Sequence, residues 1–248
     1  MKHRNLIFLL LAAASIVFVS CGREPAPTFM FESYQQEFDT KQPFKVDMSY
    51  IRITNADRSH VLKSIEESNR RAFFGIEGTL PRTMRKTFDM AAAKFRDENN
   101  CDEEQFSHGE YELFVKSDIE VFDCTLSYVI TGYQFTGGAH GMSWVKGLNY
   151  SLETGQKLTL DDFFTPEQKS KLPAALARLL CWQLGMADTD AARLSEMGYY
   201  PENIKPTDNF CVTSTGITFL YTPYEIGVYA VGMPRIEIPY SSIDELLK

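Results

Sequence analysis

The residue whose type and position most favour chemistry is His140, which closely follows a turn built on two glycines. Gly137 and Gly138 can take backbone angles that other residues avoid, so the turn can present the histidine away from the flanking chain. An imidazole changes its charge near neutral pH and forms hydrogen bonds, which suits ligand binding. We therefore treat His140 as a ligand-binding candidate. The alternative is a histidine that ties its own loop to the core.

No specific catalytic pattern is found in the rest of the sequence. There is no HExxH or GxSxG motif, and His60, His108 and His140 fall in separate predicted elements. Asp161 and Asp162 could suggest glycoside hydrolysis, but adjacent side chains diverge, and capping of a helical turn suits them better. The sequence therefore predicts a protein that is not an enzyme and that has no metal site and no cofactor.

A set of aromatic residues offers a second kind of binding surface. Tyr133, Phe135, Trp144 and Tyr224 could line a platform for a carbohydrate, although such residues more often pack in a sheet or core. Both interpretations stay open, and Trp144 and Tyr224 join His140 as ligand-binding candidates.

Alternating and helical patterns predict the elements that position these residues. Apolar residues alternate with polar ones over 44–53, which indicates a half-buried strand, and helices are expected over about 58–74 and from about 79 to 97. Runs rich in Val, Ile, Tyr and Phe predict further strands on both sides of the glycine turn. They cover residues 111–122, 125–135 and 144–152.

The C-terminal part adds a helix and more strands. Thr165, Pro166 and Gln168 form a capping pattern at a helix that runs toward Met186, and Pro173 predicts a kink or two short helices there. A hairpin over 209–221, a strand over 235–240 and a short helical end follow. We expect an α+β fold with a central antiparallel sheet, helices packed on it and two half-domains that share one continuous sheet region.

The N-terminus predicts export and lipid anchoring. A basic start precedes an apolar run over residues 6–19, and Cys21 follows, as at the lipidation site of a bacterial lipoprotein. The run has 14 residues, fewer than the roughly 20 that a membrane-spanning helix needs. Residues 1–20 are thus expected to be a lipoprotein signal peptide and 21–33 a flexible tether. The alternatives are an ordinary signal peptide or a membrane-stop helix.

Cysteine count and net charge narrow the options further. After Cys21, four cysteines remain, at 101, 124, 181 and 211, and either two disulfides or buried free thiols are compatible with this number. The net charge of −8 and the lack of a basic stripe argue against a nucleic-acid partner.

Five motifs resemble the paired extracytoplasmic domains of the lysozyme-sensing anti-sigma factor RsiV, which also precede the catalytic domain of the peptidoglycan deacetylase PdaC. They are Thr136-Gly-Gly-Ala-His140, Leu158-Thr-Leu-Asp-Asp-Phe-Phe164, Gly216-Ile-Thr-Phe-Leu-Tyr-Thr-Pro-Tyr-Glu-Ile226, Tyr229-Ala-Val-Gly232 and Ile236-Glu-Ile-Pro-Tyr240. The resemblance implies a PdaC-like half over 34–155 and an RsiV-like half over 156–248.

The resemblance and the export signal together predict an envelope lipoprotein that is not an enzyme and that acts by binding a partner. Its expected partner is a lysozyme-type protein or a cell-wall fragment, in the periplasm or on the cell surface. Two alternatives are a peptidoglycan-modifying enzyme, or an accessory domain of one, and a structural lipoprotein that binds another envelope protein.

Overall fold

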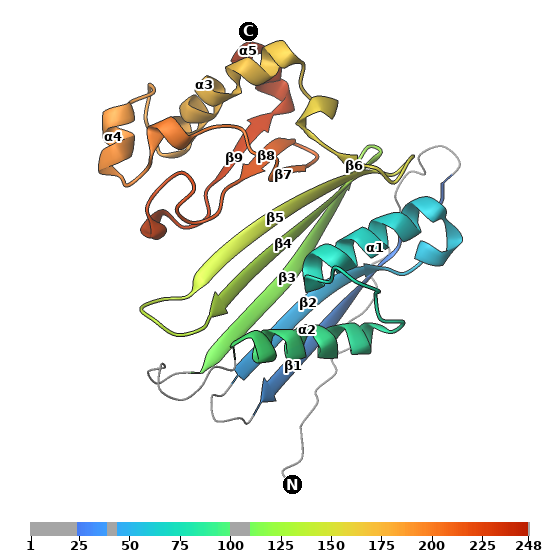
Figure 1. Ribbon diagram of the computed structural model, residues 1–248. Coiled ribbons are helices and arrows are strands. Elements are labelled where there is room, and N and C mark those ends of the chain that lie inside the picture. The colour runs from blue at the N-terminus through green and yellow to red at the C-terminus, as the bar shows by residue number, and fades with distance from the viewer. Residues whose placement is uncertain (1–23, 39–43, 100–109, 248) are drawn as a thin grey trace. The chain divides into compact units, whose positions relative to one another are not determined.

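The computed structural model describes residues 24–38, 44–99 and 110–247. Nine strands form two sheets in this part of the chain, one of six strands in the order β1-β2-β3-β4-β5-β6 and one of three in the order β7-β8-β9 (Figure 1). The signal peptide predicted over 1–20, the lipidation candidate Cys21, Cys101 and His108 lie outside the described residues. Within these residues, no helix has the length and apolarity needed to cross a membrane.

Contacts between residues divide the chain into two compact units that interleave in sequence. Unit 1 comprises Met1–Asp118 and Ile130–Met142, and unit 2 comprises Ile119–Val129 and Ser143–Lys248. The chain therefore passes between the units within β3 (Tyr111–Phe122), β4 (Thr125–Phe135) and β5 (Met142–Ser151). These units do not correspond to the two halves predicted from the sequence, whose boundary at residue 155 stays a prediction.

In unit 1, α1 (His60–Phe74) and α2 (Met84–Asn99) pack against β2 (Phe44–Ile53). Alternate residues of β2, including Phe44, Val46 and Tyr50, are fully buried because they face these helices. The Tyr50 ring lies 5.0 Å from that of Phe73 in α1, and the Phe44 ring lies 5.9 Å from that of Phe95 in α2. The alternation seen in the sequence thus marks the core face of β2.

The six-stranded sheet is mixed, which corrects the expectation of an antiparallel sheet. β1 (Phe29–Phe38) pairs antiparallel with β2, but β2 pairs parallel with β3, with Phe44 opposite Tyr111. A parallel pair needs a long crossover connection, and α1 and α2 supply it between β2 and β3. The α+β class itself is confirmed.

The N-terminal tether is shorter than predicted. Residues 29–33 belong to β1, and the chain just before it is also held, since Asn55 accepts from the Thr28 N–H at 2.9 Å and donates to the Ala26 carbonyl at 2.8 Å. The prediction rested on the proline-rich composition of residues 22–27. Pairing of β1 with β2 over ten residues orders the chain from Phe29 onward.

The helix predicted from residue 79 begins at Met84 instead. The Arg70 guanidinium binds the Pro81 carbonyl at 2.8 Å, and Thr83 Oγ1 accepts from the Lys86 N–H at 3.4 Å. Thr83 therefore starts the first turn of α2.

In unit 2, α3 (Pro166–Gln183) packs on β9 (Arg235–Pro239), which pairs antiparallel with β8 (Gly216–Leu220). Thr165 and Gln168 form the predicted capping box. The helix continues through Pro173 as a single element, in contrast to the predicted break. Burial of its apolar side on both sides of Pro173 offsets the lost hydrogen bond. The remaining strands and α-helices of the described residues are β6 (Lys157–Leu158), α4 (Ala191–Glu196), β7 (Phe210–Val212) and α5 (Ile243–Leu246).

The expected continuous sheet region around the glycine turn is present, because the six-stranded sheet includes β4 and β5 on either side of that turn and β6 from the C-terminal half. β7, β8 and β9 form a separate sheet. Side chains link β7 to the longer strands within unit 2. The Ser127 hydroxyl donates to the Val212 carbonyl at 2.7 Å and accepts from the Val212 N–H at 2.9 Å, and Asn149 Nδ2 donates to the Phe210 carbonyl at 2.9 Å. These bonds take the place of a backbone ladder.

The structure contains both a disulfide-bonded cysteine and buried free thiols, the two states considered from the sequence. Cys124 is disulfide-bonded, whereas Cys181 and Cys211 are free and buried. Burial raises the pKa of the Cys211 thiol to about 11, so it stays protonated at neutral pH. The hypothesis of two disulfides among these four cysteines is therefore wrong.

Candidate functional site

The loop between β8 and β9 is the best-formed candidate surface in unit 2. It spans residues 221–234, and we name this segment the β8–β9 loop. Antiparallel neighbours are usually joined by two to five residues, so a 14-residue connection is long for a hairpin. It contains the Thr222-Pro-Tyr-Glu-Ile226 and Tyr229-Ala-Val-Gly232 motifs.

Hydrogen bonds within the β8–β9 loop fix its first turn. One Glu225 carboxylate oxygen accepts from the Thr222 N–H at 2.9 Å and from the Thr222 hydroxyl at 3.2 Å. Just before this turn, Tyr221 is buried and its hydroxyl donates to the Lys205 carbonyl at 2.9 Å. Burial, with a smaller contribution from Glu225, raises the pKa of Tyr221, so its hydroxyl remains a donor.

A second set of bonds ties the β8–β9 loop to the segment after α4. The Tyr200 N–H donates to the Ile226 carbonyl at 2.9 Å, and the Val228 N–H donates to the Gly198 carbonyl at 2.8 Å. Gly198 has a φ of 89°, and a Cβ on Gly227 would lie only 2.9 Å from the Gly198 carbonyl oxygen. The close approach of the two segments therefore depends on glycine in both.

Tyr224 is exposed on the β8–β9 loop. Its side chain is 47% exposed and its φ is 69°, a left-handed conformation that a tyrosine rarely adopts. Its ring lies 5.7 Å from that of Tyr229, and Val228 and Met197 add exposed apolar area at 39% and 44%. Strained residues held by their surroundings occur most often at functional sites. The arrangement can bind an apolar or sugar-like surface without first ordering the loop.

The candidates predicted from the sequence fall in different units. Gly137 and Gly138 have φ values of 93° and 91°, as a turn of this kind requires, and they belong to unit 1 with His140. The His140 side chain is exposed, and with Nδ1 protonated its ring donates to the Gly141 carbonyl at 2.9 Å. Trp144, half-buried in β5, and Tyr224 belong to unit 2 but come from separate elements. Their ligand-binding roles stay predictions.

Asp161 and Asp162 have structural roles, as their adjacency suggested. Asp162 accepts from the Thr159 N–H at 2.7 Å in a capping box, and Asp161 pairs with Lys169. Both line an open hollow of about 490 Å³ beside the start of α3. In the part of the chain that the structure describes, no group of three or more His, Cys, Asp or Glu side chains is placed to hold a metal ion.

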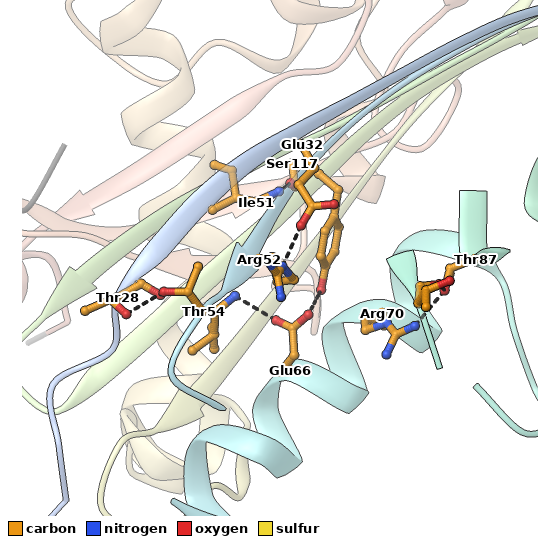
Figure 2. Close-up of polar contacts among 12 residues, drawn as sticks. Thr28, Glu32, Ile51, Arg52, Thr54, Glu66, Arg70, Thr87 and Ser117 are labelled. Atoms are coloured by element: carbon orange, nitrogen blue, oxygen red, sulfur yellow. Dashed lines mark hydrogen bonds and ion pairs between the residues drawn. The ribbon is translucent and has the colours of Figure 1, made fainter. Parts of the chain in front are cut away.

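A buried carboxylate in unit 1 was missed from the sequence. Glu66, on α1, is only 7% exposed, and its carboxylate accepts from the Tyr50 hydroxyl and from the Ile53 N–H, each at 2.9 Å (Figure 2). Burial raises the pKa of Glu66 from 4.5 to about 7, although the two hydrogen bonds and the positive charges of Arg70 and Arg52 lower it. The sequence did contain one indication of its burial, because Glu66 lies one turn after Leu62, on the apolar side of α1.

The chain folds as an α+β protein of two compact units. Two family models match its sequence, one after the other along the chain. Residues 37–143 match the model described as Deacetylase PdaC, and residues 161–241 match the model described as Protein of unknown function (DUF3298). Each stretch lies inside one of the two predicted halves. The resemblance seen in the sequence motifs is thereby confirmed.

Two solved structures share the fold. A crystal structure of a DUF3298 family member from Bacteroides fragilis NCTC 9343 has a TM-score of 0.69 and 25% identity, over 90% of this chain and 94% of that chain. A DUF3298 family protein from Pseudomonas aeruginosa PAO1 has a TM-score of 0.64 and 19% identity, over 92% and 97%. At that identity the second shows likeness of fold alone.

A curated relative is Esterase Rv3036c of Mycobacterium tuberculosis (strain ATCC 25618 / H37Rv), 32% identical over 124 residues. The match covers 49% of this chain and 52% of the relative, so the chain spans about half the length of that protein. The name describes the relative. What the comparisons show for this chain is likeness to the PdaC model over residues 37–143 and to the DUF3298 model over residues 161–241.

Proposed function

We propose that this chain is a non-enzymatic binding module of the bacterial envelope, and that its β8–β9 loop recognises a lysozyme-type protein or a cell-wall fragment. The observation that carries the proposal is the exposed Tyr224, held in a left-handed conformation beside Tyr229 on a hydrogen-bonded loop. An exposed aromatic ring on a rigid frame loses little conformational entropy on binding, which is why such residues dominate many interfaces.

The cellular setting of the proposal comes from the N-terminal sequence. Export followed by lipidation at Cys21 would place the domain at a membrane surface facing the cell wall, on either the periplasmic or the outer side. Labelling of the protein with a fatty-acid analogue, abolished by Cys21→Ser, tests this setting separately from binding.

Tyr224→Ala is expected to weaken binding of the partner about tenfold or more, because it removes the exposed aromatic ring from the proposed binding surface. Calorimetry with lysozyme and with soluble peptidoglycan fragments measures the affinity and also separates the two partners. Trp182→Ala is the matched control, because Trp182 in α3 is also about half exposed, at 48%. If wild-type protein binds neither partner, or if both variants bind equally well, the proposal is wrong.

His140→Ala tests the candidate of unit 1 separately. The histidine is exposed on the turn between β4 and β5, so the variant is expected to fold normally. A loss of affinity of the same size as for Tyr224→Ala would assign His140 to the binding surface. Unchanged affinity would make it a residue that shapes its own turn.

A peptidoglycan-modifying enzyme, or an accessory domain of one, is the second candidate, favoured by the names of the PdaC model and of the esterase relative. Turnover of a cell-wall substrate that disappears on changing His140 or Asp161 would support it over binding alone. Crosslinking in the native membrane followed by co-purification tests the third candidate, a structural lipoprotein that binds another envelope protein.

A further inference from the structure

The interface between α1 and β2 buries polar groups that it does not fully pair. In the part of the chain that the structure describes, Glu66 is the only buried residue with an acidic or basic side chain. One turn later, Asn69 is fully buried, and neither its amide nitrogen nor its amide oxygen has a hydrogen-bond partner among the described residues. An unpaired amide in a core costs free energy, so this stretch of α1 packs on β2 less favourably than an apolar stretch would.

The two cations closest in effect to Glu66 are both bound elsewhere. Arg52 of β2 forms an ion pair with Glu32 of β1, and the Arg70 guanidinium binds the Thr87 hydroxyl of α2 at 2.6 Å (Figure 2). Both arginines therefore act on Glu66 only as charges at a distance. An ionised Glu66 thus has no ion pair among the described residues.

The other groups that face Glu66 do not supply a cation either. Tyr50 and Ile53 of β2 each donate one hydrogen bond to its carboxylate, but burial outweighs these bonds and the two arginines together. The residues that α2 buries are not ionisable, and the 3₁₀ turn η1 (Ala56–Arg58) buries none. Water is therefore the remaining means of stabilising the charge, and it can surround the carboxylate only if α1 moves.

The strongest contacts of α1 lie in its last two turns. The Phe73 ring lies 5.0 Å from that of Tyr50 in β2, and the Phe74 ring lies 5.0 Å from that of Phe88 in α2. The bond from Arg70 to α2 comes from the same end of the helix. The buried residues of the first two turns are Leu62, Ile65 and Glu66. The first half of α1 can therefore leave β2 while the second half stays bound.

We propose that the first half of α1, residues 60–69, is a flap controlled by one proton, which lies on β2 while Glu66 is protonated and lifts when Glu66 ionises. Lifting lets water reach the Glu66 carboxylate and the Asn69 amide. It also uncovers the apolar side of β2 at Tyr50 and Ile53, which are buried in the closed form. Because the rest of unit 1 stays folded, the open form is a different state from the unfolded chain.

Hydrogen exchange of the full chain measures the lifting, with each rate corrected for the intrinsic exchange rate at its pH. Protection of the amides of residues 63–69 is expected to fall about tenfold or more from pH 5 to pH 8. Most of the fall should occur below about pH 7, because there the closed form still holds the Glu66 proton and the open form has released it.

A low concentration of urea separates lifting from unfolding. Unfolding exposes a large surface and is promoted by urea, whereas a local opening exposes little and is nearly independent of it. Exchange of residues 63–69 should therefore not change with urea below the unfolding transition. Exchange of the Val46 amide, in the buried centre of β2, should increase with urea. The same urea dependence at both places would overturn the proposal.

Three variants test the role of the proton. Glu66→Gln should make the protection of residues 63–69 independent of pH. His60→Gln is the matched control and should keep the wild-type dependence, because His60 is exposed on the same half of α1 and imidazoles change charge in this range of pH. Asn69→Leu removes the unpaired amide and should raise protection at both pH values. A pH dependence that survives Glu66→Gln or disappears in His60→Gln, or lower protection in Asn69→Leu, would overturn the proposal.

Discussion

The free energy of unfolding is expected to fall by about 3 kcal/mol as the pH rises from 4.5 to about 7, and a Glu66→Gln variant is expected to lose this dependence. The folded protein holds the Glu66 proton up to about pH 7, whereas the unfolded chain releases it near pH 4.5. Between these values the folded state binds more protons, so stability decreases with rising pH. Below pH 4.5 the contribution is fully present, and above about pH 7 it is lost.

The geometry around Glu66 supports the glutamine variant as a clean test. Glutamine has nearly the same shape, and its carbonyl can still accept from the Ile53 N–H or the Tyr50 hydroxyl. The charged neighbours Arg52 and Arg70 remain in place. The variant therefore removes the titrating proton and keeps the packing between α1 and β2.

Urea unfolding at a series of pH values, compared between wild type, Glu66→Gln and Glu67→Gln, measures the effect. Glu67 is the adjacent, exposed residue of α1, so its variant should keep the wild-type pH dependence. A larger protection factor at the Ile53 amide at pH 5 than at pH 8, after correction for the intrinsic exchange rate at each pH, would locate the change at this carboxylate. Equal pH dependence in wild type and Glu66→Gln would show that Glu66 is not the group responsible.

Gly147→Ala is expected to destabilise unit 2 by about 2 kcal/mol or more, because β5 and the β7 backbone meet too closely for a side chain. A Cβ on Gly147 would lie 2.1 Å from the Phe210 carbonyl oxygen and 2.8 Å from the carbonyl carbon. The same region carries the Gly147 N–H bond to Asn209 at 2.6 Å and the Asn149 bond to the Phe210 carbonyl. Separating the strands to fit a methyl group would stretch both.

Gly78→Ala provides the control, since a Cβ there has no neighbour within 4 Å and its φ is not left-handed. Its stability should change by no more than about 0.5 kcal/mol in either direction. Thermal and urea unfolding of both variants measure the difference. If Gly147→Ala unfolds like the wild type, the close packing of β5 on β7 is not what holds the three-stranded sheet in unit 2.

The sequence by itself determined the elements whose signals are local. The strands over 44–53, 111–122 and 125–135 and the capping box at Thr165 are all present with the predicted residues. A period of two, a run of β-branched and aromatic residues, or a capping pair depends only on neighbours in the chain, so each can be recognised without the fold. The motifs that indicated the family are likewise short and continuous.

The tertiary structure alone decided which elements meet. The parallel pairing of β2 with β3, the recruitment of residues 29–33 into β1 and the separate sheet of β7, β8 and β9 depend on partners far away in the sequence. The same holds for the candidate site, where Tyr224 was a candidate but its left-handed backbone and the support from Gly198 were not foreseeable. Glu66 is the clearest case, because the burial that raises its pKa arises only when α1 packs against β2 in the folded chain.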